Sequence, residues 1–497
     1  MKASTRFSEE RREKLKYFLL LIPLAISLFA MANHEWWRDE ANPWLIARAS
    51  EGIGALMENV RFIGHPRLYY LIVYMVQHLT GMPMALGILN LFFMIAALWL
   101  FMSAPFPLIV RLLFALGYYP VYQYGVFVRS YSLLVFLLFL YAYLYVHRPR
   151  LEKSRLAVLA LLAQVHLISL SAAGALLLFE VIDLFRLKKP MSARLVAVYL
   201  CVAASMILSI IQMLPTGTDK VVLMGANPGY LWIGITTGFV PGLQGHGHSA
   251  WQVWVGGIFF SAGLATLLGR WRDLSRYLLL VLSLLLCFSI VYQGFRWHFG
   301  FYMIFLVVCL WMSSRVRPFG PFQNIYLAIL FSLHGCLMIL AVQEDFVRPY
   351  SNGPAVAGMI HRECLEGLPM VGVAYESNGV PDEMCYSWEV DCIQPVMAGI
   401  PGKEALDPVT GEMVPYWGHY GDWNYFKHMN GKTLESNLEL IRSAAKTDLL
   451  VIFVRKNPRM RLEGRLVPPS FLETVATFSQ PFDFGEEMVL CKYPRQR

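Results

Sequence analysis

Long apolar runs separated by short polar segments dominate the chain from residue 17 to residue 342. A membrane-spanning helix needs about 20 predominantly apolar residues, and most of these runs approach that length. The pattern predicts an all-α membrane bundle of about eleven transmembrane helices. The expected spans cover residues 17–31, 82–102, 106–124, 130–147, 156–168, 171–186, 193–214, 251–269, 277–292, 299–314 and 322–342.

The segment between the first two expected spans, residues 34–81, contains two shorter apolar patterns. Apolar residues recur at helical spacing between Leu45 and Val60, and residues 66–80 form an apolar run that is too short for a span. Short helices of this kind lie at membrane surfaces. We therefore expect two interfacial helices in one large first outer loop.

After residue 342 the pattern changes, because charged residues, Pro and Gly become frequent and no further span follows. Residues 371–375, 449–454 and 488–491 are typical of strands, and residues 436–445 and 471–478 are expected to form short helices between them. This alternation predicts a small C-terminal α/β domain, residues 343–497, beside a transmembrane domain, residues 1–342. We interpret the aromatic segment 401–431 as a covering loop rather than a binding surface.

Composition supports the membrane assignment. Of the 497 residues, 57% are hydrophobic and only 15% are charged, whereas soluble domains carry about 25% charged residues. The net charge is +8, but no basic patch interleaved with aromatic residues occurs in a polar domain, which argues against nucleic-acid binding.

The distribution of Lys and Arg predicts the topology. Residues 147–155, 186–194, 270–276 and 314–317 are basic, and the expected register places them on the same side as the basic residues 1–16. Such segments are typical of cytoplasmic loops. We therefore expect a cytoplasmic N-terminus and an extracytoplasmic C-terminal domain. No small-residue cleavage site follows the first apolar run, so we expect the first span to be uncleaved.

The stretch HEWWRDEANPW, residues 34–44, carries the most informative polar residues. Carboxylates are costly in hydrocarbon, so Asp39 and Glu40, directly after a span, are expected to face water or a protein cavity. The expected topology places further ionisable residues at the same level: Arg38, Arg129, Arg296, His65, His166, His246, His248 and His298.

This set suits a transferase that uses a lipid-phosphate sugar donor. A carboxylate takes the proton from the attacking hydroxyl group, and arginines match the departing phosphate through their planar guanidinium groups. The lipid tail requires an apolar groove that opens to the bilayer. Both features are expected of an integral membrane enzyme.

Three motifs occur in order: Trp37-Arg38-Asp39-Glu40 after the first span, Gly64-His65-Pro66-Arg67-Leu68-Tyr69-Tyr70 about 25 residues later, and Arg129-Ser130-Tyr131 at the outer start of a later span. By these motifs, over residues 17–150, and by architecture over its whole length, the chain resembles the GT-C superfamily of polyprenyl-phosphate-sugar glycosyltransferases. That superfamily includes protein O-mannosyltransferases and the aminoarabinose transferase that acts on lipid A.

The resemblance implies an inverting sugar transfer from a polyprenyl-phosphate donor to an extracytoplasmic lipid, glycan or protein acceptor. The expected location is the outer face of the cytoplasmic (inner) membrane of a bacterial-type cell. It matches Asp39 to the catalytic acid with Glu40 as its neighbour, His65 and Pro66 to a loop that closes on the site, and Arg129 to a residue near the lipid phosphate. The chain departs from the usual pattern at Arg67, where a second proline is common, and in its compressed Arg-Ser-Tyr motif.

We therefore expect Asp39 and Glu40 to be catalytic, with Asp39 as general base. The remaining expected site residues bind the donor phosphate (Arg129, Arg296, His298) or the substrate (His65, Tyr131, Trp37). No metal ligand is assigned. Some relatives have a further acid in later outer loops, where this chain offers only Asp219, so a divalent metal stays an alternative rather than an expectation.

Structural alternatives accompany these assignments. Asp39 and Glu40 could cap a helix that begins near Asn42 and Pro43, and we interpret Trp36, Trp37 and Trp44 first as an interfacial belt. His166 is expected to be an interior histidine, and the His246/His248 pair part of a flexible loop. Alternative functions are a transporter or flippase of an envelope glycolipid and a non-catalytic envelope-assembly protein.

Overall fold

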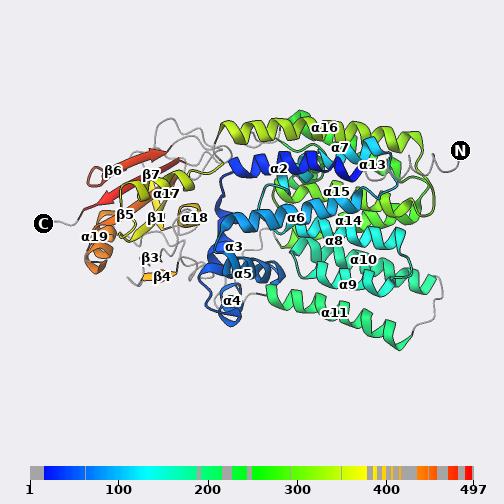
Figure 1. The fold of residues 1–497 in the computed structure, drawn as a ribbon, viewed down its shortest axis with the longest axis horizontal. Helices are drawn as coiled ribbons and strands as arrows, with labels where there is room; N and C mark the ends of the chain where they lie inside the picture. The colour runs from blue at the N-terminus through cyan, green and yellow to red at the C-terminus, as the bar shows by residue number, and fades with distance from the viewer. Residues whose placement is uncertain are drawn as a thin grey trace.

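The computed structural model describes residues 16–494 except 62, 187–191, 215–226, 243–248, 292, 349, 378–383, 389–393, 399–403, 407–412, 416–433, 446, 456–467 and 479–486. It contains a large helical bundle with a small sheet domain at one end (Figure 1). We call this end of the bundle the domain end and the other the opposite end.

The helices follow the apolar runs. They are α2 (Leu21–Asn33), α3 (Arg38–Arg48), α4 (Ile53–Asn59), α5 (Leu68–Thr80), α6 (Pro83–Phe101), α7 (Leu108–Ala115), α8 (Tyr131–His147), α9 (Glu152–Ala163), α10 (Leu167–Arg186), α11 (Ala193–Met213), α12 (Pro228–Phe239), α13 (Ala250–Thr266), α14 (Trp271–Ile290), α15 (Arg296–Ser313), α16 (Pro321–Val347), α17 (Gly353–Arg362), α18 (Gln394–Ala398) and α19 (Leu434–Ala445), with a π-helical turn η1 (Tyr118–Gln123).

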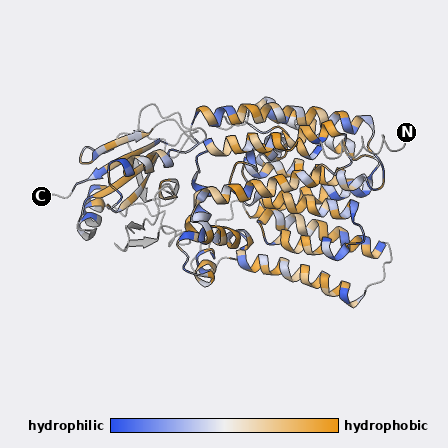
Figure 2. Ribbon diagram, viewed as in Figure 1, coloured by the Kyte–Doolittle hydropathy of each residue, from blue (hydrophilic) through white to orange (hydrophobic). Residues whose placement is uncertain are grey.

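The chain is a multi-pass membrane protein. Within the described residues, seven helices are long and apolar enough to cross a membrane: Lys16–Asn33, which contains α2, and α6, α10, α11, α14, α15 and α16. Large apolar side chains such as Ile207, Trp254 and Ile329 are more than half exposed on the bundle surface, and Figure 2 shows apolar residues along the full length of its helices. Soluble proteins rarely expose so much apolar surface.

The expectation of about eleven spans is not confirmed. The expected span 106–124 is broken into α7 and η1, and α9 has only 12 residues. The expected loop 215–250 also contains a helix, α12, whose Gly238 packs so closely on the backbone of Phe299 that a Cβ atom would collide with the carbonyl oxygen.

Side chains from neighbouring helices satisfy the irregular backbone between α7 and α8. Asn90 Nδ2 donates to the carbonyl oxygens of Tyr124 and Gly125, each at 3.1 Å, and Ser27 Oγ donates to Val121 O at 3.0 Å. Non-helical backbone inside a membrane bundle requires such partners because hydrocarbon offers none. This support fixes the segment that leads to Arg129.

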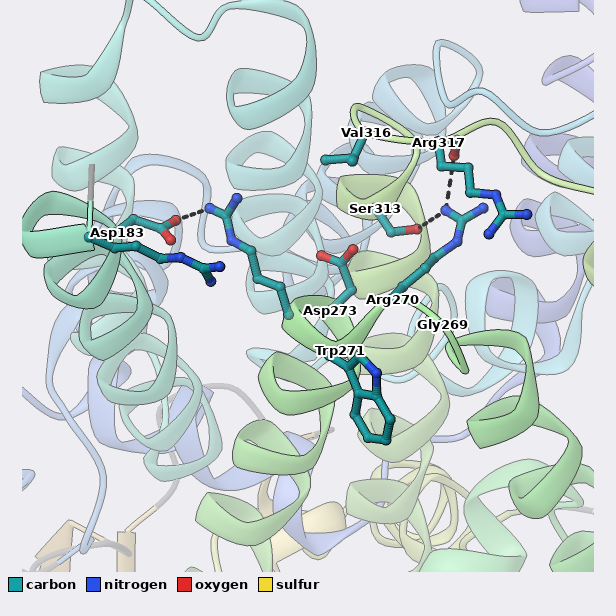
Figure 3. A pocket seen from close by; sticks show the side chains of 10 residues that line it. Asp183, Gly269, Arg270, Trp271, Asp273, Ser313, Val316 and Arg317 are labelled. Carbon is teal, nitrogen blue, oxygen red and sulfur yellow. Dashed lines mark hydrogen bonds and ion pairs between the residues drawn. The ribbon is translucent and has the colours of Figure 1, made fainter.

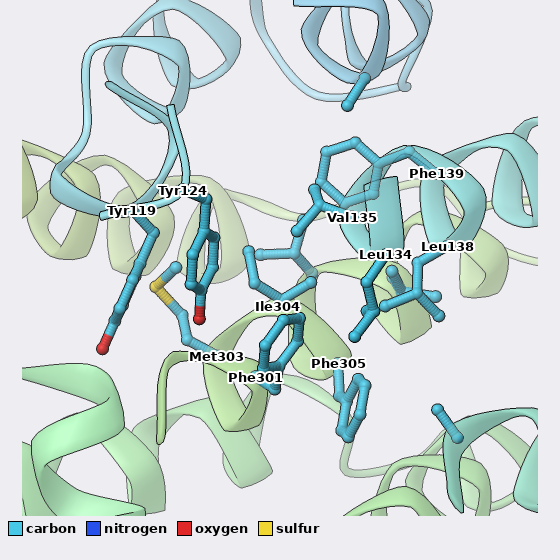
Figure 4. Close-up of a cluster of buried hydrophobic side chains, with 14 of the residues drawn as sticks. Tyr119, Tyr124, Leu134, Val135, Leu138, Phe139, Phe301, Met303, Ile304 and Phe305 are labelled. Atoms are coloured by element: carbon cyan, nitrogen blue, oxygen red, sulfur yellow. The ribbon is translucent and has the colours of Figure 1, made fainter. Parts of the chain in front are cut away.

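The interior of the bundle is closely packed. Figure 4 shows side chains of the α7–α8 connection, α8 and α15 that meet in it, among them Tyr124, Phe139 and Phe305. Helix α15 is the central helix of the bundle, because 94% of its residues are buried. A buried helix of this kind holds its N-terminal residues rigidly at the domain end.

Helices α3, α4 and α5, which connect α2 to α6 along the chain, lie at the domain end of the bundle (Figure 1). Helix α5 covers most of the apolar run 66–80 and has 13 residues, which agrees with the expectation that this run is not a span. Helix α3 packs Ala41 and Leu45 against Val356 of α17 and Val396 of α18. The C-terminal domain is therefore docked on the segment that carries Asp39 and Glu40.

The C-terminal domain contains a five-stranded mixed sheet of order β2-β1-β5-β7-β6. The strands are β1 (Met370–Ser377), β2 (Met384–Trp388), β5 (Leu449–Arg455), β6 (Glu473–Phe478) and β7 (Glu487–Tyr493), with a separate hairpin of β3 (Glu404–Leu406) and β4 (Met413–Pro415). Strands β1 and β5 are parallel and the other pairs antiparallel.

The three expected strands and the first expected helix of this domain are confirmed as β1, β5, β7 and α19. The helix expected at 471–478 is wrong, since residues 473–478 form the edge strand β6 on β7. Helix α16 continues to Val347, five residues beyond the expected domain boundary. Apart from β3 and β4, the expected covering loop 401–431 lies outside the described residues.

Candidate functional site

Asp39 lies in the first turn of α3, which begins at Arg38 and not near Asn42 and Pro43 as one alternative expected. Pro43 is therefore inside the helix. It has no N–H group, so it leaves the carbonyl oxygen of Asp39, four residues earlier, without the usual helical hydrogen bond. Nη1 of Arg129 donates to that oxygen.

Asp39 and Arg129 also form an ion pair. Nη1 of Arg129 lies 3.6 Å from Oδ2 of Asp39, and Nε of Arg38 lies 3.1 Å from Oδ1. Burial acts to raise the pKa of Asp39, but the positive charges of Arg129 and Arg38 outweigh it, so the pKa lies below its ordinary value. Asp39 is therefore ionised at neutral pH, with its side chain 20% exposed.

Glu40 is fully buried and faces away from solvent. Its Oε1 accepts a hydrogen bond of 2.6 Å from the backbone N–H of Val128, and its Oε2 accepts from the backbone N–H of Trp37 at 3.3 Å. Glu40 thus caps α3, although this helix begins at Arg38 and not near Asn42, where the structural alternative expected the capped helix to begin. It also ties the helix to the residue before Arg129.

His34 links Glu40 to the end of α16. Its Nε2 lies 2.9 Å from Oε2 of Glu40, and its Nδ1 lies 2.9 Å from Oδ2 of Asp345. Burial alone would lower the pKa of His34, but the charges of Asp345 and Glu40 raise it well above the ordinary 6.5. The imidazolium form can donate to both carboxylates at once.

Tyr131 and His298 form the next layer, at the starts of α8 and α15. The backbone N–H of Phe295 donates to Nδ1 of His298 at 2.9 Å, so the proton of the neutral ring is on Nε2. Nε2 lies 2.8 Å from the hydroxyl of Tyr131 and donates to it. Because the Tyr131 hydroxyl accepts this hydrogen bond, its own proton is available to donate to another group.

His65 and His166 stack on one another with ring centroids 4.4 Å apart, and His166 lies 5.5 Å from Tyr131 and 5.7 Å from His298. Nδ1 of His166 accepts from the backbone N–H of Ile168, so Nε2 carries the proton. Among the described residues, neither this Nε2 nor Nδ1 of His65 has a hydrogen-bond partner although both atoms are buried. Such atoms are costly unless a ligand or water satisfies them.

Burial and the nearby charge of Arg129 lower the pKa of His65 to about 4, although Asp39 opposes the shift. At neutral pH the ring is uncharged and can accept as well as donate. Its loop begins with Gly64, whose φ of +66° is a conformation that side chains rarely adopt.

A narrow cavity of about 10 Å³ opens beside Arg129 and Tyr131. Trp37, Gln123, Phe127 and Trp297 complete its lining, and the Trp37 and Trp297 rings meet edge to face at 5.0 Å. Small-molecule sites usually measure about 300 Å³ or more, so this cavity is far smaller than a typical ligand site and is closed in this structure.

The structure brings together most of the expected site residues: Asp39, Arg129, His65, Tyr131, His298 and Trp37. Arg296 is the first residue of α15, half-buried and two positions from His298, and its phosphate contact stays a prediction. Trp37 and Trp44 are 9% and 2% exposed, so they do not form an exposed belt. His246, His248 and Asp219 lie outside the described residues.

Sequence reasoning missed three contributors. His166 is the buried, hydrogen-bonded interior histidine that was expected, but its position beside the rings of His65 and His298 was not predicted. His34 and Asp345 were not recognised as a pair, because 311 positions separate them.

Among the residues that the structure describes, no group of three or more His, Cys, Asp or Glu side chains could hold a metal ion.

Comparison of the chain with models of protein families, with curated proteins and with solved structures finds no match.

Proposed function

We propose that the protein is an integral membrane glycosyltransferase of the GT-C type, which transfers a sugar from a polyprenyl phosphate to an acceptor outside the cytoplasm. The observation that carries this proposal is the Asp39–Arg129 pair, 3.6 Å apart, beside two buried imidazole nitrogens that have no partner among the described residues. The transfer needs a carboxylate to accept the proton of the attacking hydroxyl group, and a cation and hydrogen-bond donors to stabilise the departing phosphate.

Asp39 is the general base. The oxygen of an acceptor hydroxyl attacks the anomeric carbon, and the bond between that carbon and the phosphate oxygen breaks. The polyprenyl phosphate leaves with the bonding electron pair, and Asp39 takes the hydroxyl proton. Attack from the side opposite the phosphate inverts the configuration at the anomeric carbon.

Arg129 neutralises the departing phosphate. Its guanidinium group is held by the Asp39 carbonyl oxygen and lies 5.9 Å from the Tyr131 ring. The Tyr131 hydroxyl and Nε2–H of His166 are suitable donors to phosphate oxygens, and His298 orients Tyr131. Arg296, the first residue of α15, adds positive charge two positions from His298.

Glu40 is a positioning residue in this proposal. It is fully buried and joins α3 to Val128. It therefore keeps Asp39 and Arg129 next to one another and does not exchange protons with the substrate. Trp37 forms one wall for the sugar. His65 lies on the loop that opens, because the closed cavity must enlarge to admit a donor.

The proposal places the domain end outside the cytoplasmic membrane and the N-terminus in the cytoplasm. The basic segments expected in cytoplasmic loops support this orientation, since residues of three of them line one cavity at the opposite end.

The test is a transfer assay with the purified chain and a panel of polyprenyl-phosphate sugars, with radiolabelled sugar followed into acceptor lipids, glycans and peptides. We expect release of polyprenyl phosphate in step with labelled acceptor. Sugar-lipid movement across proteoliposomes without any transfer would instead support a flippase and contradict the proposal.

A further inference from the structure

Another cavity, lined mainly by charged residues, lies at the opposite end of the bundle, far from Asp39. It has a volume of about 370 Å³ and is lined by the C-terminal ends of α10 and α15 and the N-terminal turn of α14 (Figure 3). His298 and Ser313, near the two ends of α15, are separated by roughly 22 Å at about 1.5 Å per residue. The two cavities are therefore separate.

Four arginines and two aspartates line this cavity: Arg186, Arg270, Arg272, Arg317, Asp183 and Asp273. Both carboxylates already have partners, since Arg272 binds Asp183 and Nη1 of Arg276 binds Asp273 at 2.7 Å. The lining therefore has an excess of positive charge.

Arg270 is the most deeply placed of these cations, at 9% exposure. Its guanidinium group donates only to uncharged oxygens in the described structure: Ser313 Oγ at 2.9 Å, Arg317 O at 2.9 Å and Pro318 O at 2.8 Å. Arg186 and Arg317 form no ion pair among the described residues. Because the two aspartates are already paired, the remaining positive charges repel one another, so the cavity favours an anionic ligand.

Exposed apolar side chains accompany the arginines. Trp271 and Val316 line the cavity and are 72% and 77% exposed, and the exposed Phe185 and Leu268 are the chain neighbours of the lining residues Arg186 and Gly269. Exposed apolar side chains beside guanidinium groups match a phospholipid, whose phosphate and acyl chains are adjacent, better than a soluble anion.

We propose that this cavity binds the headgroup of an anionic phospholipid, with the phosphate between Arg270 and Arg317 and the acyl chains against Trp271 and Phe185. Guanidinium groups match phosphate oxygens in geometry as well as charge. Basic pockets between membrane helices are sites of this type. The bound lipid joins α10, α14 and α15 by offsetting the repulsion between their arginines.

The test compares the purified full-length chain with the double variant R186Q/R317Q. Both residues are exposed, and neither side chain holds the fold together by an ion pair. The matched control is R150Q/R194Q, because both residues are exposed, lie near helix ends in basic connections and do not line the cavity. Lipid binding is measured by native mass spectrometry and thermal unfolding, with phosphatidylglycerol, phosphatidylcholine or inorganic phosphate added to the detergent-solubilised protein.

We expect phosphatidylglycerol to bind and to raise the midpoint of unfolding of the original chain and the control alike. R186Q/R317Q should bind it about tenfold more weakly or worse, because the variant loses the Arg317 contact with the phosphate and the positive charge that Arg186 adds to the lining. Equal binding of phosphatidylcholine, equal protection by inorganic phosphate, or an equal loss in R150Q/R194Q would each overturn the proposal. Unchanged binding in R186Q/R317Q would do the same.

Discussion

Arg129 donates a hydrogen bond to the carbonyl oxygen of Asp39, an acceptor that Pro43 leaves unused by the helix. The proline therefore has a function in the site although it contacts no substrate in the proposal. It keeps one helical carbonyl available, and that carbonyl holds the arginine beside the Asp39 carboxylate.

Pro43→Ala should separate activity from stability. An alanine N–H can donate to Asp39 O and compete with Arg129, and a net hydrogen bond of this kind is worth about 0.5–1.5 kcal/mol. We expect sugar transfer to fall several-fold while the midpoint of thermal unfolding is unchanged or higher. Transfer at the original rate with a correctly folded variant would show that the contact has no role in positioning Arg129.

Tyr131→Phe tests the donor side of the site. The substitution keeps the ring beside Arg129 and His166 but removes the hydroxyl that accepts from His298. Hydrogen bonds to charged groups contribute about 1.5–3 kcal/mol, so we expect kcat/KM for the lipid-phosphate donor to fall about 10- to 100-fold.

Tyr326→Phe is the control for Tyr131→Phe, because it removes a buried tyrosine hydroxyl that bonds Phe259 O in another part of the bundle. Its effect should be confined to stability. A similar loss of kcat/KM in both variants would mean that Tyr131 acts only through packing.

The position of His34 between the carboxylates of Glu40 and Asp345 predicts a loss of stability at alkaline pH. The groups that face its ring are Glu40 from α3, Asp345 from α16, Phe127 and Tyr350, and Glu35 lies near Asp345. Because the pKa of His34 is raised in the folded protein, its stabilisation is complete below about 6.5 and is lost as pH rises through the higher folded value.

Thermal unfolding between pH 6 and pH 10 measures this effect. His34→Gln should lower the midpoint near pH 6.5, since breaking a buried ionic pair costs about 3–5 kcal/mol, and it should flatten the alkaline decline. An alkaline decline of equal size in His34→Gln would assign the pH dependence to other groups.

The sequence predicted those features that depend on local pattern. The apolar runs located the helices, and β5 was recognised because it is apolar on both faces, with Leu450 and Ile452 toward α17 and Leu449 and Val451 toward α19. The motifs also placed Asp39, Arg129 and Tyr131 in one region, as found in the structure.

Other features depend on tertiary contacts and could not be predicted in the same way. In the segment 471–478, Leu472 and Val475 have helical spacing, but Thr474, Val475 and Thr477 are β-branched and the open edge of β7 was available for pairing. The broken helix after Ala115 depends on Asn90, whose amide satisfies backbone oxygens 34 and 35 positions away. His166 gave no signal because a single histidine before an apolar run does not indicate its neighbours.

The most direct test of the proposed function compares Asp39→Asn with the original chain in two measurements on the same preparation: binding of the polyprenyl-phosphate sugar and its transfer. Asparagine keeps the size of the side chain but cannot take a proton, so we expect donor binding to be retained and transfer to fall by about 10²- to 10⁴-fold. Transfer at the original rate by a folded Asp39→Asn variant would contradict the assignment of Asp39 as general base and, with it, the proposed mechanism.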